Sequence, residues 1–194
     1  MCLGADDADE RLDGLYPPEF RRFRRQHTTP VEVAARAAAW LAPTPGARVL
    51  DVGAGAGRFC VTGALTTLGH FTGVEQRGWL VEAAREAAAK LGVTRAEFVN
   101  GDIRAVDWAE YEGFYLFNPF GENYLPDDEQ IDHAEVRARA RMDGDIAFVE
   151  QQLVRAPFGT RVVTWHGFGG LLEGYSCVRR TYVRNTALEC LVRV

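Results

Sequence analysis

Three glycines at alternate positions follow a short apolar run near residue 50. The stretch reads RVLDVGAGAG and places the glycines at 53, 55 and 57, directly after Asp51 and Val52. Between a strand and a helix, glycines let the backbone turn sharply and let a ligand lie against it without a Cβ in the way. The helix that follows presents unpaired backbone N–H groups to such a ligand. The pattern favours a nucleotide site at the end of the first strand over a turn that is merely rich in glycine.

Acidic residues follow the next two apolar runs along the chain. Glu75 closes the run HFTGVE, and Asp102 follows the run RAEFVNG. An acidic side chain about 20 residues after a glycine loop can accept hydrogen bonds from both hydroxyls of a ribose. Either residue alone could be an ordinary exposed carboxylate. Anchors at adjacent strand ends together strengthen the prediction of a nucleotide.

The spacing of the glycines separates the classes of nucleotide site. A dinucleotide fingerprint, GxGxxG, needs a glycine at position 58, where this chain has Arg58. No GK[ST] sequence follows the glycines, which excludes a P-loop for nucleoside triphosphates. An NAD-type oxidoreductase is therefore disfavoured, and we keep it as an alternative.

Strand-like and helix-like segments alternate along the chain and so indicate how the site is positioned. The strand candidates are RVLDV, HFTGVEQ, RAEFVNGD, GFYLFNPF and GTRVVTW, followed by the closing pair YSCVRRTYV and ALECLVRV. Alternation predicts a parallel sheet with helices on both faces. The turn around Asn185 is too tight for a crossover, so the closing pair must be antiparallel. We therefore expect an α/β fold with a doubly wound, mostly parallel sheet.

The segment before the first strand predicts an N-terminal helical extension. Thr29 is expected to cap a helix that has Pro30 in its first turn and ends before Pro43. Residues 1–45 form this extension, which could fold over the site as a lid, and residues 46–194 form the main domain. The first ten residues, MCLGADDADE, have neither the basic start nor the apolar stretch of a signal peptide, and we expect a loose end there.

The GxGxG spacing, the acidic anchors and the terminal hairpin together resemble the class I S-adenosylmethionine-dependent methyltransferases. The resemblance covers the chain from about Thr29 to its end, and VLDVGAGAG is its most specific motif. It implies a Rossmann-like methyltransferase fold with a seven-stranded sheet, and S-adenosyl-L-methionine as cofactor. It also implies methyl transfer to a small molecule or a protein side chain. The alternatives are the NAD-type oxidoreductase and a nucleotide-binding protein of the same fold without methyltransferase activity.

The resemblance further implies a set of cofactor-binding residues at the strand ends. In it, the residues after the first strand hold the methionine part of the cofactor, those after the second bind the ribose, and those after the third face the adenine. The last member of the set, after the fourth strand, lies close to the transferable methyl group. The set consists of Asp51, Gly53, Ala54, Gly55, Gly57, Glu75, Gln76, Asp102, Ile103 and Asn118.

Two residues are candidates for a catalytic role. Asn118 begins Asn-Pro-Phe-Gly, which differs from the Asn-Pro-Pro-aromatic tetrad of many amino-methylating members and puts adenine-N6 or glutamine methylation in doubt. Its side chain could accept a hydrogen bond from an amine or could simply cap a turn. His166 follows the fifth strand and is the best candidate for a general base, although a histidine beside Trp165 is also consistent with a structural role.

Charge and cysteine content predict the partners and the compartment. The net charge is −5, which argues against a nucleic-acid partner because phosphates favour a basic face. The four cysteines, at 2, 60, 177 and 190, form no CxxC pair, so we expect no metal site and reduced thiols in the cytoplasm. Without an apolar run of about 18 residues, a membrane partner is not expected.

Overall fold

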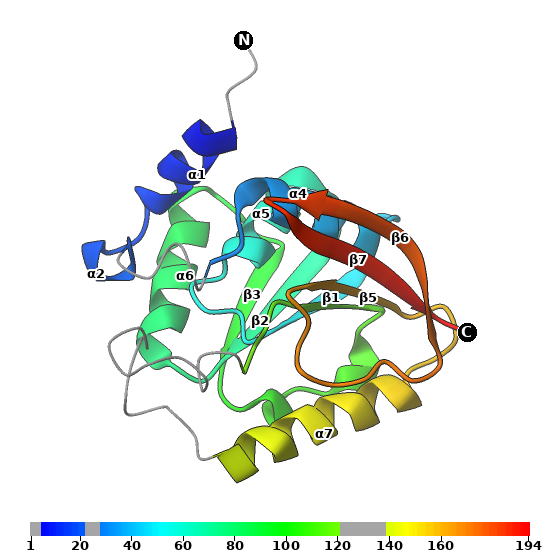
Figure 1. Cartoon of the computed structure of the whole chain (residues 1–194). Helices are drawn as coiled ribbons and strands as arrows, with labels where there is room; N and C mark the ends of the chain where they lie inside the picture. Colours follow the sequence, from blue (N-terminus) through cyan, green and yellow to red (C-terminus); the bar gives the residue numbers. More distant parts are fainter. Residues whose placement is uncertain (1–4, 22–27, 121–138) are drawn as a thin grey trace.

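The computed structural model describes residues 5–21, 28–120 and 139–194, which form one seven-stranded sheet in the order β3-β2-β1-β4-β5-β7-β6 (Figure 1). The first five strands run parallel, and β7 is antiparallel to both of its neighbours, β5 and β6. This confirms the expected sheet and its terminal hairpin. The strands are β1 (Arg48–Val52), β2 (His70–Glu75), β3 (Ala96–Asn100), β4 (Gly113–Leu116), β5 (Arg161–Trp165), β6 (Tyr175–Val183) and β7 (Thr186–Arg193).

Helices cover the two faces of this sheet (Figure 1). One face carries α4 (Val31–Leu41), α5 (Arg58–Thr66) and α6 (Gly78–Lys90), and the other carries α7 (Arg139–Arg155) and two short 3₁₀ turns, η1 (Ile103–Ala105) and η2 (Trp108–Glu110). Before them lie α1 (Ala5–Asp13) and α2 (Pro18–Arg21). No helix among the described residues is both long enough and apolar enough to cross a membrane.

The central strands are apolar on both sides because both of their faces are covered. In β1, Val49 packs with the cluster under α4, α5 and α6, whereas Leu50 and Val52 pack with the cluster under α7. The ring of Tyr115 in β4 stacks on the ring of Phe59 in α5, and the two ring centroids are 4.0 Å apart. These contacts hold the start of α5 against the middle of the sheet.

The order of the strands reverses direction between β1 and β4. From β1 the chain proceeds outward through β2 and β3, and it then returns to place β4 on the other side of β1. In open sheets of this kind, ligands bind in the crevice outside the carboxyl ends of the strands at the reversal. At this carboxyl edge, a Cβ added to Gly53 after β1 would lie 3.0 Å from the Cβ of Pro119 after β4. The two loops therefore meet at the expected place.

The structure of the N-terminal extension differs from two predictions made from the sequence, the loose end and the helix cap. Residues 5–13 form α1 instead of a loose end, with Leu12 buried and Asp9 and Asp13 in ion pairs with Arg58. The predicted cap by Thr29 is also wrong. Helix α4 begins at Val31, whose N–H donates to the Asp9 carboxylate at 2.8 Å, and the Thr29 hydroxyl instead contacts the Tyr115 hydroxyl at 3.2 Å.

Helix α7 is joined to the turn after β3. Its described part runs from Arg139 to Arg155, and residues 131–138 lie outside the described part of the chain. Arg104 in η1 contacts the middle of the described part of this helix by pairing with the buried Asp145 at 2.7 Å. The turn after β3 is thereby joined to α7.

Candidate cofactor site

The glycine loop adopts the left-handed backbone that its sequence favours. Gly53, Gly55 and Gly57 have φ values of 74°, 54° and 71°. A Cβ on Gly57 would lie 2.8 Å from the Cβ of Ala84 and closer still to the Phe98 ring, so this glycine is needed for packing between α5, α6 and β3. A Cβ on Gly55, in contrast, would have no atom within 4 Å. The backbone at Gly55 is thus the part that a ligand can approach.

Glu75 lies at the end of β2 with its carboxylate against this loop. One oxygen accepts from the N–H of Gly55 at 3.1 Å and the other from the N–H of Arg77 at 2.9 Å, and the residue is only 7% exposed. Asn100 joins the ends of β2 and β3, because its amide donates to the Glu75 carbonyl at 3.1 Å and to the Gln76 carbonyl at 2.9 Å. The carboxylate is therefore held in place beside the open glycine backbone.

The turn after β3 places Asp102 and Ile103 next along the carboxyl edge. The Asp102 side chain caps η1 by accepting from the N–H of Arg104 at 3.0 Å, and it also pairs with the Arg104 guanidinium at 3.0 Å. The Ile103 carbonyl accepts from the indole of Trp108 at 2.9 Å. Both residues are half-exposed, so the turn is rigid and remains open to solvent.

Asp51 is the most perturbed carboxyl group near the loop. Burial raises its pKa to about 7, the Cys60 thiol at 3.6 Å lowers it, and the negative charge of Glu75 raises it further. A buried carboxyl of this kind is partly protonated at neutral pH. It can therefore change its protonation state when a charged ligand binds beside it.

Protonation of Asp51 should make the stability of the protein depend on pH. Between the unfolded pKa of 3.8 and the folded value of about 7, the folded state retains a proton that the unfolded chain has released. This group should therefore lower the free energy of unfolding by about 1.4 kcal/mol per pH unit as the pH rises through that window. Asp51→Asn should remove the decline, as measured by urea unfolding at pH 5 and pH 7. Equal declines in both proteins would contradict the shifted pKa.

A hollow opens between the glycine loop, the end of β4 and the N-terminal extension. About 310 Å³ of empty space, part of which is open solvent, lies between its lining residues. The extension contributes the hydroxyl residues Thr28 and Thr29 and the aromatic ring of Phe20. The lining residues are Phe20, Thr28, Thr29, Asp51, Gly53, Ala54, Ala56, Arg58, Phe59, Tyr115 and Phe117.

The two catalytic candidates lie at the ends of neighbouring strands. Asn118 and His166 both have left-handed backbones, with φ values of 40° and 66°, and the N–H of Asn118 donates to the Gly167 carbonyl at 2.7 Å. Both side chains are exposed to solvent. Asn118 lies just after β4, and His166 lies just after the neighbouring strand β5. The His166 ring contacts Trp165 and Phe117, with centroids 4.6 and 5.7 Å away. Left-handed non-glycine residues cluster at functional sites, which makes these two strand ends a candidate site for an acceptor.

The site fits an adenosyl cofactor and offers no metal centre within the described ranges. An approachable glycine backbone, a fixed carboxylate at the next strand end and a hollow beyond the loop follow one another along the edge. In residues 5–21, 28–120 and 139–194, no group of three or more histidine, cysteine, aspartate or glutamate side chains could hold a metal ion. The predicted cofactor residues are thus brought together along one edge of the sheet.

Comparison with known proteins agrees with this geometry. Residues 43–120, from the end of the N-terminal extension through β4, match the family model of a methyltransferase domain. This part of the chain is therefore similar to a methyltransferase domain. The matched part contains the glycine loop, Glu75 and Asp102, and it ends just after Asn118.

A curated relative and two solved structures are similar to this chain. The 23S rRNA (uracil(1939)-C(5))-methyltransferase RlmD of Shewanella sp. (strain ANA-3) is 42% identical over 74 residues, which are 38% of this chain and 16% of the relative. The chain thus spans a small part of the length of the curated relatives it matches. An RNA methyltransferase from Salinibacter ruber, solved with S-adenosyl-L-homocysteine, has a TM-score of 0.61 at 20% identity and 86% and 93% coverage of the two chains. Magnesium protoporphyrin IX methyltransferase from Synechocystis PCC 6803, solved with its cofactor, has a TM-score of 0.60 at 16% identity and full coverage of both chains.

These relatives overturn the expectation that nucleic acid is an unlikely partner, because they include an rRNA methyltransferase and an RNA methyltransferase. The expectation came from the net charge, which is a sum over the whole chain. Helix α1 holds five acidic residues and one arginine, so it accounts for four of the five net negative charges. Two of its acids, Asp9 and Asp13, are neutralised by ion pairs with Arg58, and Asp9 also pairs with Arg184. The residues of the chain outside α1 sum to a net charge of −1, so most of the net negative charge that argued against RNA lies in this one helix.

Proposed function

We propose that the protein is an S-adenosylmethionine-dependent methyltransferase that modifies RNA. The observation that carries the first part is the continuous site along the carboxyl edge, from Asp102 through Glu75 and the glycine loop to the hollow beside Phe117. The match to a methyltransferase domain supports it. The 42% identity to an rRNA methyltransferase supports RNA as the acceptor class.

In this proposal the strand order sets the direction of the cofactor. The adenine lies over β3 beside Asp102 and Ile103, and the ribose lies at the end of β2, where Glu75 accepts from its hydroxyls and Gln76 lies nearby. The amino-acid part lies over β1 and β4, against Asp51, the backbone of Gly53 to Gly57 and Ala54. Asn118 lies closest to the transferable methyl. Arg58 stands at the position where a dinucleotide fingerprint has glycine, and its guanidinium pairs with two carboxylates. Both facts argue against an NAD-type site.

When bound, the cofactor supplies a methyl group on a good leaving group, so the protein mainly has to align the acceptor with it. Alignment of this kind can contribute about 7–11 kcal/mol, whereas a general base contributes about 3–5 kcal/mol. At the ends of β4 and β5, the exposed His166 beside Phe117 offers a surface on which an unstacked base can lie, which is the usual way proteins hold single-stranded RNA. The ring is only partly covered, and this partial loss of solvent lowers the pKa of His166 below its ordinary value of 6.5, so the imidazole is neutral at pH 7 and able to accept a proton.

His166→Gln should therefore lower kcat by about 100-fold and leave the affinity for S-adenosyl-L-homocysteine nearly unchanged. The wild-type rate should fall as the pH drops below the usual histidine range, and that fall should be absent in the variant. Methyl transfer measured between pH 5 and 8, with isothermal titration in parallel, checks both points. His70→Gln, at the exposed amino end of β2, is the matched control. An unchanged kcat would leave His166 without a catalytic role.

The acceptor class can be tested by isotope labelling. The protein is incubated with S-adenosylmethionine carrying a tritiated methyl group and, in separate reactions, with unmodified 23S rRNA transcripts, pooled cellular RNA, denatured cellular protein and a small-molecule fraction. We expect label in an RNA sample that ribonuclease releases and protease does not. Label only in protein or in the small molecules would reject RNA. Binding of S-adenosyl-L-homocysteine without label in any sample would favour the non-catalytic nucleotide-binding alternative.

A further inference from the structure

The terminal hairpin of β6 and β7 is positively charged in an acidic chain. Residues 175–194 include four arginines and one glutamate, a net charge of +3, whereas the whole chain carries −5. Strand β6 is the outermost strand of the sheet at this end, and its residues 176–180 are all exposed. The hairpin therefore presents positive charge to solvent at one edge of the molecule.

Arginines gather on the side of this hairpin that faces α4. Thr181 in β6 lies opposite Leu188 of the cluster under α4, and its hydroxyl accepts from Arg36 of α4 at 3.4 Å. Arg179 lies opposite Cys190 of the same cluster, two residues before Thr181, and so extends from the same face of β6. Two residues of a strand are about 7 Å apart, so Arg36 and Arg179 are close neighbours.

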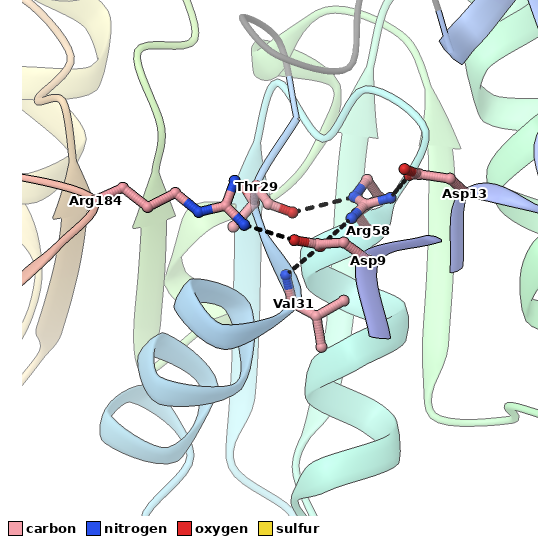
Figure 2. Close-up of polar contacts among 6 residues, drawn as sticks. All are labelled: Asp9, Asp13, Thr29, Val31, Arg58 and Arg184. Carbon is pink, nitrogen blue, oxygen red and sulfur yellow. Dashed lines mark hydrogen bonds and ion pairs between the residues drawn. The ribbon is translucent and has the colours of Figure 1, made fainter. Parts of the chain in front are cut away.

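Arg161 and Arg184 lie on the same side of the hairpin. Burial raises the pKa of the Cys190 thiol, and the positive charges of Arg161 and Arg179 lower it, so both guanidinium groups lie near the same side of β7. Arg184, in the β6–β7 turn, pairs with Asp9 of α1 at 2.8 Å (Figure 2). The group formed by Arg36, Arg161, Arg179 and Arg184 is called the arginine face below.

Acidic residues offset only part of the charge of the arginine face. Glu32 and Asp9 each pair with one of its arginines, at 3.2 and 2.8 Å. In residues 5–21, 28–120 and 139–194, neither Arg161 nor Arg179 forms an ion pair. Arg179 is exposed and Arg161 is half-buried. Two guanidinium groups on this face are therefore available to an anion.

Protection of an edge strand does not account for these charges. Charged side chains on an outer strand can prevent it from pairing with another chain, and Arg180, on the opposite face of β6, can do so. Arg161, however, lies in β5, two strands inside the edge, and Arg36 lies in α4. Positive charge that extends over a helix, an inner strand and the outer strand fits an extended anionic ligand better.

We propose that the arginine face binds the phosphate backbone of the RNA substrate. Guanidinium groups pair with phosphates through two parallel hydrogen bonds, and such contacts hold RNA without reading its sequence. The inference rests on the proposed function, since it assigns the surface on which the proposed acceptor is held. It places that surface outside the predicted cofactor residues.

The arginine face ends at the edge of the sheet where the acceptor is expected. Leu188, near the start of β7, pairs with Trp165 at the end of β5, so the β6–β7 turn lies at the carboxyl edge. Arg184 is therefore at the same edge as His166, and Arg179 lies further back along β6. An RNA strand held by Arg179 and Arg184 is thereby directed toward His166.

Fluorescence anisotropy with a short fluorescein-labelled RNA of mixed sequence tests this surface. Each lost phosphate contact lowers the slope of log K against log salt by about 0.7, which is about a fivefold loss of affinity near 0.1 M salt. Arg161→Gln and Arg179→Gln should each weaken RNA binding by about fivefold, and the double variant should weaken it by about 20-fold. Affinity for S-adenosyl-L-homocysteine should change by less than about twofold, because the two arginines lie outside the cofactor residues.

Arg155→Gln is the matched control. Arg155 ends α7 on the other face of the sheet, is exposed, and forms no ion pair within the described ranges. Its substitution should leave the RNA affinity and the salt slope nearly unchanged. Equal losses for Arg155→Gln and Arg179→Gln would show that RNA binds to positive charge at any place on the surface, and would overturn the inference. Unchanged RNA affinity in the double variant would do the same.

Two further outcomes separate the inference from the proposed function. If the wild type binds RNA through Arg161 and Arg179 but methylates no RNA, the proposed function is rejected and the surface stands. If polyglutamate competes with RNA for the wild type as effectively as unlabelled RNA does, the surface belongs to an acidic protein partner and the inference is wrong.

Crosslinking to the wild-type protein gives a second test that needs no variant. RNA that contains 4-thiouridine is irradiated with the protein, and the crosslinked peptides are identified by mass spectrometry. We expect crosslinks in α4 or in residues 175–186, which carry three of the four arginines of the face. Crosslinks confined to α6 and α7 would refute the inference.

Discussion

Arg58→Met should lower the free energy of unfolding by about 3–5 kcal/mol, one of the two largest effects we expect from a single substitution. The side chain is almost fully buried between Asp9 and Asp13, which are 11% and 6% exposed. Removing the arginine leaves these carboxylates without their common cation in a site with little water. Attraction in the intact cluster largely offsets the cost of burial, so the loss reflects the unpaired charges more than the strength of the pairs. Urea unfolding monitored by circular dichroism measures the change.

Arg48→Met is the matched control for this prediction. Arg48 pairs with Glu110 at 2.6 Å, but both side chains are about half exposed to solvent. Exposed pairs contribute about 0–1 kcal/mol, so this variant should be close to the wild type. Adding Asp9→Asn and Asp13→Asn to Arg58→Met should recover part of the lost stability, because the uncompensated charges are then gone. If Arg48→Met and Arg58→Met lowered the free energy of unfolding by similar amounts, burial would not explain the contribution of Arg58 to stability.

Glu75→Gln should weaken binding of S-adenosyl-L-homocysteine by about 10- to 100-fold. In the proposed complex, the carboxylate accepts from both ribose hydroxyls while it also holds the N–H groups of Gly55 and Arg77. Glutamine has nearly the same shape, but it has one accepting oxygen in place of two and carries no charge. The variant therefore loses acceptor capacity with little change in packing, and isothermal titration calorimetry measures the affinity.

Glu112→Gln is the control for the glutamate substitution. Glu112 lies at the opposite edge of the sheet, just before β4, where its carboxylate accepts from the N–H of Arg48 at 3.2 Å. Its substitution should leave the affinity for S-adenosyl-L-homocysteine unchanged. If Glu75→Gln also bound the probe as tightly as the wild type, Glu75 would not be the ribose anchor.

The strands and the glycine loop could be predicted because their determinants are local. Apolar runs bounded by turn residues give the β-strands, and the glycines at 53, 55 and 57 give the left-handed turn between β1 and α5. The tight turn at Asn185 similarly predicts the antiparallel hairpin. These features depend on residues within a few positions of one another.

The features that escaped prediction depend on contacts between distant residues. Helix α1 looks like a loose acidic end until Arg58, 49 positions after Asp9, is placed beside it. Thr29 resembles a helix cap, but Tyr115 takes its hydroxyl and Asp9 takes the capping role. Arg58 at the position of a fingerprint glycine is an indication of this cluster in the sequence, but without its distant partners it argues only against a dinucleotide site.

The bridge from Arg58 through Asp9 to Arg184 has a consequence for synthesis on the ribosome. Asp9 and Arg184 are 175 positions apart in the sequence, so their ion pair can form only after the residues between them have been synthesised. Helix α1 therefore completes its docking only after the β6–β7 turn has been made. Until then the nascent protein exposes an acidic N-terminal helix whose partner on the β6–β7 turn has not yet been made.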